Sequence, residues 1–170
     1  ENYRENAQMI RSSTIEALVN CTTDVQKSIH RLEDMGIDLS AVRYRVAVFD
    51  MDIYSGMYQI DMEKQQESAL MAFVLFNVSD EIVTGEDAGI AYQESGNRVS
   101  ILFQEKWNHN FTRKTREICQ EIQEKIKELM GIEVSMGIGS WVKHPEELLI
   151  SHSQAEQALQ YRYLLGGNLL

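Results

Sequence analysis

Two carboxylates at the end of a predicted strand are the residues best suited to hold a divalent ion. Asp50 closes the segment 43–50, Arg-Tyr-Arg-Val-Ala-Val-Phe-Asp, and Asp52 follows two residues later. The second half of this segment is continuously apolar, which predicts a central, buried strand. Carboxylates placed there can bind Mg²⁺ and, through it, a nucleotide phosphate. Alternatively, both side chains face solvent at the start of the next helix, where the helix dipole favours negative charge.

The histidines and cysteines do not suggest further chemistry. The four histidines share no spacing and have no Cys or Glu companion at ligand distance along a helix, so we predict no metal site; they are His30, His109, His144 and His152. Cys21 and Cys119 lack metal-binding spacing and are interpreted as small buried hydrophobes. The pair Gly137 and Gly139 is too short for a dinucleotide motif and instead predicts close approach of a helix.

Composition narrows the class of protein. The 170 residues contain 16 Lys and Arg against 26 Asp and Glu, which gives a net charge of −10. Such a surface repels a phosphate backbone, so we do not expect the chain itself to bind nucleic acid. No apolar run approaches the length needed to span a bilayer, which is about 20 residues. Without a disulfide framework, a reducing cytoplasm is expected. Because the chain begins with Glu, we expect it to be a segment of a longer protein.

Hydrophobic periodicity and turn residues predict an α+β domain. The expected elements, in order, are helices over 2–20 and from 25 to about 36, a strand at 43–50, a helix at 63–83, strands at 89–92 and 99–103, a helix at 112–130, a strand at 133–140 and a last helix that begins near Pro145. After the helical hairpin the order is β-α-β-β-α-β-α. This order predicts a ferredoxin-like antiparallel sheet flanked by helices.

Spacing also suggests which helix faces are buried. In the first helix Ile10, Ala17 and Leu18 fall on one side. In the helix at 63–83 the predicted core-facing residues, at steps of three and four, are Leu70, Phe73, Val74, Asn77 and Val78.

The pattern resembles the GGDEF domain, which is the diguanylate cyclase fold. The resemblance covers about 43–170 and rests on the strand ending in Asp-x-Asp, the hairpin, the strand Val-Ser-Met-Gly-Ile-Gly and the last helix with Ala-Glu-Gln-Ala-Leu. The final stretch, residues 151–168, resembles one subset of the family more closely than the family as a whole. This subset is the degenerate GGDEF-like domains in the middle of AraC-family transcriptional regulators, many of them response regulators. The resemblance therefore implies a connector at 1–40 and a degenerate GGDEF-like domain at 41–170.

The hairpin tip departs from the pattern of active family members. Aligning the following strand places the Gly-Gly-Asp/Glu-Glu-Phe motif on Ser95-Gly96-Asn97-Arg98-Val99. The catalytic acidic position is then Asn97, a weak neutral ligand, and Arg98 places a cation where a divalent ion would be held. Arg98 is interpreted as a solvated hairpin cation; the alternative is contact with an anionic ligand or another domain. We expect no catalytic residues and no cofactor.

Other positions that the family uses for nucleotides are also changed. By resemblance, the phosphate-binding Lys is replaced by Ser55 and the guanine-contacting Asn by Tyr58, and the product-inhibition motif at 86–89 reads Glu-Asp-Ala-Gly. What remains of the cleft is Asp50, Asp52, Tyr58, Asn97 and Arg98, so an alternative function is small-ligand or nucleotide sensing there.

The resemblance implies a non-catalytic module that relays a signal between domains of a cytoplasmic two-component regulator. Its partners would be a receiver and helix-turn-helix domains of the same chain, with DNA bound only through the latter and no membrane contact. The thin apolar stripe of the first helix leaves a homodimer possible. Trp107, before the helix at 112–130, either covers the core edge or anchors a partner domain.

Overall fold

The helices and strands occur in the predicted order. The computed structural model describes residues 2–51, 62–106 and 115–165, with the backbone alone at 2, 62–66 and 162–165. A helical hairpin comes first, formed by α1 (Asn2–Val19) and α2 (Val25–Asp34). The remaining elements are β1 (Arg43–Met51), α3 (Met62–Gly85), β2 (Gly89–Glu94), β3 (Arg98–Glu105), α4 (Thr115–Met130), β4 (Val134–Ile138), the short 3₁₀ helix η1 (Pro145–Glu147) and α5 (Leu148–Leu165).

The four strands form one antiparallel sheet in the order β2-β3-β1-β4. β3 separates β1 from β2, so the crossover through α3 skips a strand, which is the ferredoxin-like arrangement. β1 is central, as its continuous apolar run predicts. Its last pair with β3 is Phe49 with Val99, and Asp50 pairs with Ser135 of β4. The predicted fold class is confirmed.

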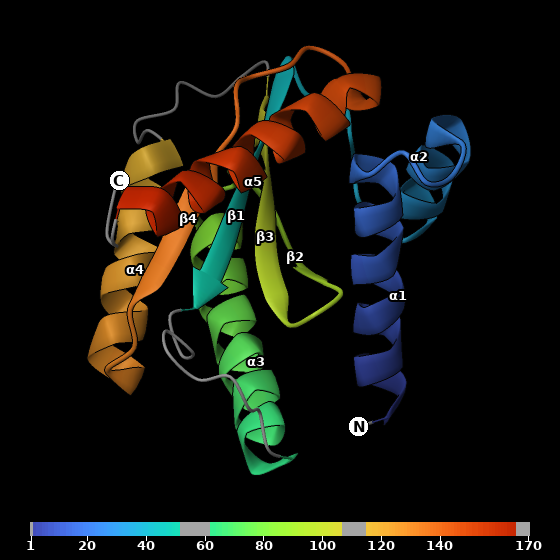
Figure 1. Ribbon diagram of the computed structural model, residues 1–170. Coiled ribbons are helices and arrows are strands. Elements are labelled where there is room, and N and C mark those ends of the chain that lie inside the picture. Colours follow the sequence, from blue (N-terminus) through green and yellow to red (C-terminus); the bar gives the residue numbers. More distant parts are fainter. Residues whose placement is uncertain (1, 52–61, 107–114, 166–170) are drawn as a thin grey trace.

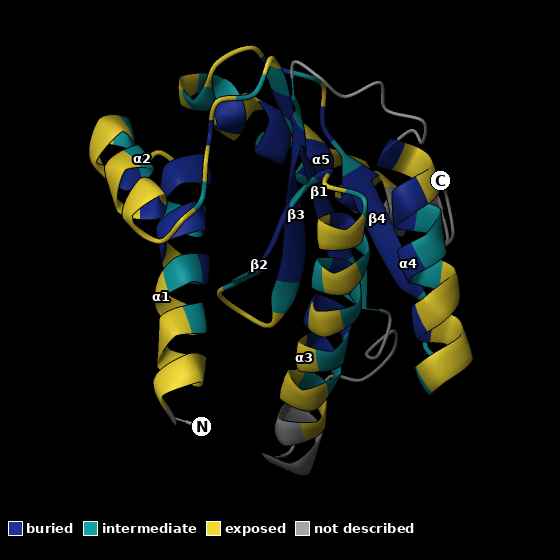
Figure 2. Ribbon diagram, turned by 180° about the vertical axis from the view of Figure 1, so that it is seen from behind, coloured by how far each residue is buried: buried dark blue, intermediate teal, exposed yellow. Residues whose placement is uncertain are grey.

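Helices cover both faces of the sheet, and each face has its own apolar cluster. One face, here called the α3/α4 face, packs Phe49, Ile101 and Phe103 against those two helices. The opposite face, here called the α5 face, packs Val48 and Leu102 against α5 and the helical hairpin. Figure 1 shows α5 crossing the sheet in front of α3 and α4, and Figure 2 shows the same layers from behind. Alternating residues of each strand therefore meet different helices.

The buried stripe of α3 differs from the predicted one. Leu70 is 63% exposed and Phe73 is 51% exposed, whereas the buried apolar residues are Ala72, Leu75, Phe76 and Val83. Residues 69–76 are all apolar, so the sequence there offers several possible stripes, and packing against the sheet selects one of them. A similar correction applies to α1, where Ile10 is 56% exposed.

The segment Glu67–Gly85 of α3 is long and apolar enough, by length and composition, to cross a membrane, which corrects the expectation that no run in the sequence is long enough. Only 28% of its window is buried. However, α3 contributes Leu75 and Phe76 to the α3/α4 cluster. A core helix meets the same criterion, so this finding alone assigns no membrane span.

Close packing of α5 on β4 depends on two glycines, as predicted. A Cβ atom at Gly137 would lie 1.9 Å from the carbonyl oxygen of Ala155, and one at Gly139 would lie 1.9 Å from that of Ser151. These distances are far below van der Waals contact. The backbone of α5 therefore rests directly on the sheet, which fixes the position of every side chain that α5 directs toward the strands.

The two cysteines have different environments. Cys119 is buried as predicted, and burial, only partly offset by Arg45, raises the pKa of its thiol to about 12. Cys21 is exposed, which corrects the prediction that it is buried. It follows the end of α1 in the left-handed conformation, with φ of 54°, so it belongs to the turn between α1 and α2 rather than to a helix face.

Candidate functional site

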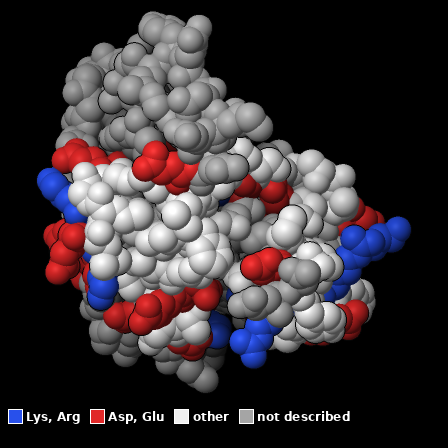
Figure 3. Space-filling view, turned by 90° about the horizontal axis from the view of Figure 1, so that it is seen from below, with Lys and Arg blue, Asp and Glu red and all other residues white. Residues whose placement is uncertain are grey.

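Three of the five predicted site residues lie in the described part of the chain, at one end of the sheet. Asp50 is half-buried next to the last β1–β3 pair, and Asn97 and Arg98 belong to the β2–β3 hairpin at the same end. Asp52 and Tyr58 lie outside the described residues, as does Trp107. Figure 3 shows acidic side chains spread over this end of the molecule, with Lys and Arg mostly toward its edges.

The hairpin tip adopts a tight turn that its sequence favours. Gly96 and Asn97 both have positive φ, 84° and 63°, and Asn97 is exposed. Glycine and asparagine are the residues that adopt this left-handed conformation at least cost. Asn97 therefore has a local structural role at the position where the resemblance places an acidic residue.

The hairpin is attached to the first helix. The backbone N–H of Ser95 donates to Glu16 Oε2 over 3.3 Å, and its hydroxyl lies 3.2 Å from Glu16 Oε1. Two residues earlier the backbone N–H of Gln93 donates to the Ser12 hydroxyl oxygen over 3.1 Å. These bonds fasten the edge strand β2 to α1, so the N-terminal helix and the hairpin form one contact surface.

The hairpin is also attached to α5 through Arg98. Its guanidinium Nη1 lies 2.9 Å from Glu156 Oε1, and the side chains are 32% and 41% exposed. Arg98 is therefore a partly exposed cation with a partner on α5 rather than an isolated one. Arg98 alternates with Val99, which packs on the α3/α4 face. Its side chain thus points to the opposite face, where α5 supplies the partner.

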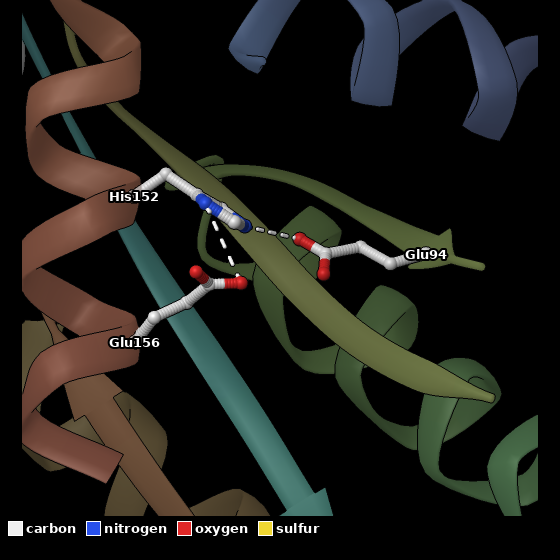
Figure 4. A group of neighbouring side chains, drawn as sticks. All are labelled: Glu94, His152 and Glu156. Carbon is white, nitrogen blue, oxygen red and sulfur yellow. Dashed lines mark hydrogen bonds and ion pairs between the residues drawn. The ribbon is translucent and has the colours of Figure 1, made fainter. Parts of the chain in front are cut away.

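Next to this ion pair lies a buried imidazole between two carboxylates. His152 Nε2 is 2.6 Å from Glu94 Oε1, and His152 Nδ1 is 3.9 Å from Glu156 Oε1 (Figure 4). The His152 and Glu94 side chains are only 5% and 8% exposed. With the partly exposed Arg98 and Glu156, these two buried residues form what is here called the buried ionic cluster: Glu94, Arg98, His152 and Glu156.

Two hydroxyl groups complete the surroundings of Glu94. The Ser100 hydroxyl donates to Glu94 Oε1 over 2.9 Å, and the buried Tyr92 hydroxyl lies 3.3 Å from the same oxygen. A buried carboxylate is costly unless its lone pairs are satisfied. Glu94 is held by partners from three elements, so its charge is well accommodated inside the protein.

The pKa values of the pair move in the directions expected for an ion pair. Burial alone raises the pKa of Glu94, but the hydrogen bond and charge of His152 outweigh it, and the net pKa lies below the ordinary value of 4.5. Burial alone lowers the pKa of His152, but Glu94 and Glu156 outweigh it, and the net pKa lies above 6.5. Both residues therefore favour their charged forms.

Among the described residues, Glu94, His152 and Glu156 form a group that could hold a metal ion, because their ligand atoms lie within 4.8 Å of one another. The charge balance favours a proton instead. Arg98 and a protonated His152 neutralise the two carboxylates, whereas a divalent ion beside a neutral imidazole would leave a net charge of +1. An uncompensated charge in a buried site is unfavourable.

The buried ionic cluster was not predicted from the sequence. The prediction that no histidine has a Glu companion at ligand distance along a helix is wrong. His152 and Glu156 are four residues apart on α5, which places them on the same side of the helix. That spacing was available in the sequence. The contribution of Glu94, 58 residues before His152 in the chain, was not, because it depends on how α5 lies on the sheet.

A separate cavity of about 570 Å³ lies between α4, β4 and α5. Its lining includes Arg116, Met136, Gln154 and Tyr161 and none of the predicted site residues. It is therefore distinct from both the hairpin end of the sheet and the buried ionic cluster.

Comparison with the curated proteins gave no match. A family model described as "GGDEF-like domain" matches residues 22–161, from just before α2 to well into α5. This range contains the whole sheet, the hairpin and the buried ionic cluster. The chain belongs to the family of GGDEF-like domains.

Proposed function

We propose that this chain is a non-catalytic module that passes a signal between other domains of an AraC-type, DNA-binding transcriptional regulator of a two-component system. The family match supports a GGDEF-like domain. The observation that carries the non-catalytic part of the proposal is the hairpin. Where an active member has carboxylates for a metal ion, this chain has the turn residue Asn97 and the paired cation Arg98.

The chemistry of Arg98 makes metal-assisted phosphoryl transfer at the hairpin unfavourable. Such a reaction needs a divalent ion held by carboxylates close to the phosphates. Arg98 brings a positive charge to this place, and Glu156 is already paired with it. Asp50 alone among the described residues of the predicted cleft offers a carboxylate.

A mechanical role is supported by what the hairpin connects. Glu16 and Ser12 of α1 bind its β2 side, while His152 and Glu156 of α5 bind Glu94 and Arg98. Among the described elements, α1 comes first and α5 comes last. A displacement of α1 by a preceding receiver domain would thus reach α5 through the hairpin, provided that the joint has two arrangements of different stability.

The same proposal fixes the expected partners. The neighbouring receiver and helix-turn-helix domains would belong to the same chain, and DNA would be bound through the latter in the cytoplasm. The net charge of −10 is consistent with a module that leaves DNA binding to another domain.

The catalytic question is tested by incubating the purified protein with GTP and Mg²⁺ and measuring cyclic di-GMP, with an active diguanylate cyclase in parallel. We expect no product from this chain. Formation of cyclic di-GMP would contradict the proposal. A rise of several degrees in melting temperature with GTP or cyclic di-GMP, without turnover, would favour a ligand-sensing function instead.

The relay is tested with Glu16→Gln, which weakens the bond from α1 to the hairpin. In the full regulator we expect a reduced transcriptional response to phosphorylation, with the fold retained. The control is Glu33→Gln on α2, whose side chain is 52% exposed and whose partner is the exposed His30. Equal responses from both variants would contradict the role of the α1–hairpin contact.

A further inference from the structure

The buried ionic cluster joins two elements that are far apart in the sequence. Glu94 ends β2 and Arg98 begins β3, whereas His152 and Glu156 lie on adjacent turns of α5. Residues 95–97 form the turn that separates Glu94 from Arg98. The cluster therefore holds the hairpin to α5 from both of its strands.

The proton on His152 decides the charge of this cluster. With the proton, two cations face two carboxylates, and Nε2–H and Nδ1–H both point toward carboxylate oxygens. Without it, the cluster has a net charge of −1, and one imidazole nitrogen loses its hydrogen. If Nε2 keeps the hydrogen for Glu94, the Nδ1 lone pair faces Glu156 Oε1 at 3.9 Å, which is a repulsive arrangement.

Every element packed around the imidazole contributes to this balance. α5 supplies Glu156, β2 supplies Glu94 and Tyr92, and β3 supplies Arg98. α1 supplies the more distant Glu16, whose charge acts on Tyr92. Arg98 opposes protonation of His152, and the two nearby carboxylates favour it.

We propose that the buried ionic cluster is a proton-operated latch, which holds the β2–β3 hairpin against α5 while His152 is protonated and loosens when His152 loses its proton. This inference goes beyond the proposed function, because it concerns the contact between two elements of this chain and applies whatever domains flank it.

The direction of the pH effect follows from linkage. The pKa of His152 is raised above 6.5 on folding, so its contribution to stability is complete below pH 6.5 and is lost as the pH rises through the folded-state pKa. The pKa of Glu94 is lowered below 4.5, so its contribution is complete above pH 4.5 and is lost as the pH falls through its folded-state pKa. The latch is strongest between these limits and opens toward alkaline pH.

The test begins with the pKa values of the histidines, measured by NMR on the purified protein. We expect His152 to titrate above 6.5, the ordinary value for a histidine. A pKa of His152 at or below 6.5 would overturn the proposal, and this measurement needs no variant.

The second part measures hydrogen exchange of the hairpin amides at pH 6 and pH 9, corrected for the intrinsic dependence of exchange on pH. We expect the opening equilibrium of the hairpin to be larger at pH 9 than at pH 6, because the contribution of His152 is lost as the pH rises through its folded-state pKa. In His152→Gln, which keeps a donor for Glu94 but does not titrate, this pH effect should disappear. In the matched control His30→Gln it should remain.

Two results would overturn the latch. One is a pH effect on the hairpin that persists in His152→Gln, since another group would then be responsible. The other is a rise in melting temperature with Zn²⁺ at pH 7.5 in the unaltered protein but not in His152→Gln, since the cluster would then bind a metal ion rather than a proton. Absence of a Zn²⁺ effect together with loss of the pH effect supports the proposal.

Discussion

The two faces of the sheet are stabilised in different ways. The α3/α4 face is an apolar cluster of the kind that fixes a fold, with Phe49 and Phe103 fully buried against α3 and α4. The α5 face has a similar apolar cluster but also includes His152, Glu94 and Ser100, all bonded to one another through Glu94. Apolar packing is insensitive to pH, whereas a buried ion pair responds to protons and to single charge changes. The difference suggests that one face maintains the fold and the other can respond to a signal.

The largest expected effect is on the α3/α4 face. Phe49→Ala would remove a fully buried ring from the apolar cluster of this face and leave a cavity. We expect a loss of about 3–5 kcal/mol in the free energy of unfolding, measured by urea denaturation. The loss should be equal at pH 6 and pH 9. A clear dependence of this loss on pH would contradict the proposed difference between the two faces of the sheet.

A somewhat smaller effect is expected where α5 rests on β4. Gly137→Ala would place a methyl group against the carbonyl of Ala155, so α5 must move away from the sheet. We expect a loss of about 2–3 kcal/mol, measured by thermal and urea unfolding. The control Gly85→Ala, where nothing lies within 4 Å of the added Cβ, should be neutral or slightly stabilising. Equal losses for the two variants would contradict the close contact.

The buried ionic cluster should show pH-dependent coupling. Glu94→Gln removes the charge that faces His152, and we expect a loss of about 1–2 kcal/mol at pH 6. The loss should be smaller at pH 9, because the contribution of His152 falls as the pH rises through its raised folded-state pKa. A double-mutant cycle with His152→Gln should give a coupling energy at pH 6 that falls at pH 9. Additive effects at both values of pH would show that the two residues do not interact.

The smallest effect is expected at the outer part of the cluster. Arg98→Gln removes the ion pair with Glu156, whose side chains are 32% and 41% exposed. Solvent screens such a pair, so we expect a loss below about 1 kcal/mol that decreases with added salt. If the loss for Arg98→Gln were as large as the loss for Glu94→Gln, Arg98 would contribute to stability as much as the buried pair of Glu94 and His152. That result would contradict the distinction between the buried and the exposed parts of the cluster.

Much of the fold could be predicted from the sequence, because strands and helices have clear local periods. The central strand β1 and the antiparallel sheet follow from the continuous run before Asp50 and from the β-α-β-β-α-β order. The buried face of α3 could not be predicted, because its apolar residues surround the helix and only packing against the sheet selects Leu75 and Phe76 over Leu70 and Phe73.

Less of the candidate site than of the fold could be predicted from the sequence, because its contacts join residues that are far apart in the chain. The change at Asn97 and Arg98 could be seen in the hairpin sequence, but the partner of Arg98 could not, since Glu156 is 58 residues away. The spacing of four residues between His152 and Glu156 is present in the sequence. The pairing of His152 with Glu94 depends on the close approach of α5 that Gly137 and Gly139 permit.

The central claim is that the hairpin end of the sheet is a joint between α1 and α5 rather than a nucleotide site. The most direct measurement is an NMR titration of the protein with GTP and Mg²⁺ that follows the backbone amides of Ser95, Gly96 and Asn97. The account predicts that these amides and that of Asp50 do not shift. Saturable shifts of the hairpin amides together with Asp50 would contradict it, because they would place a bound nucleotide where the joint is proposed.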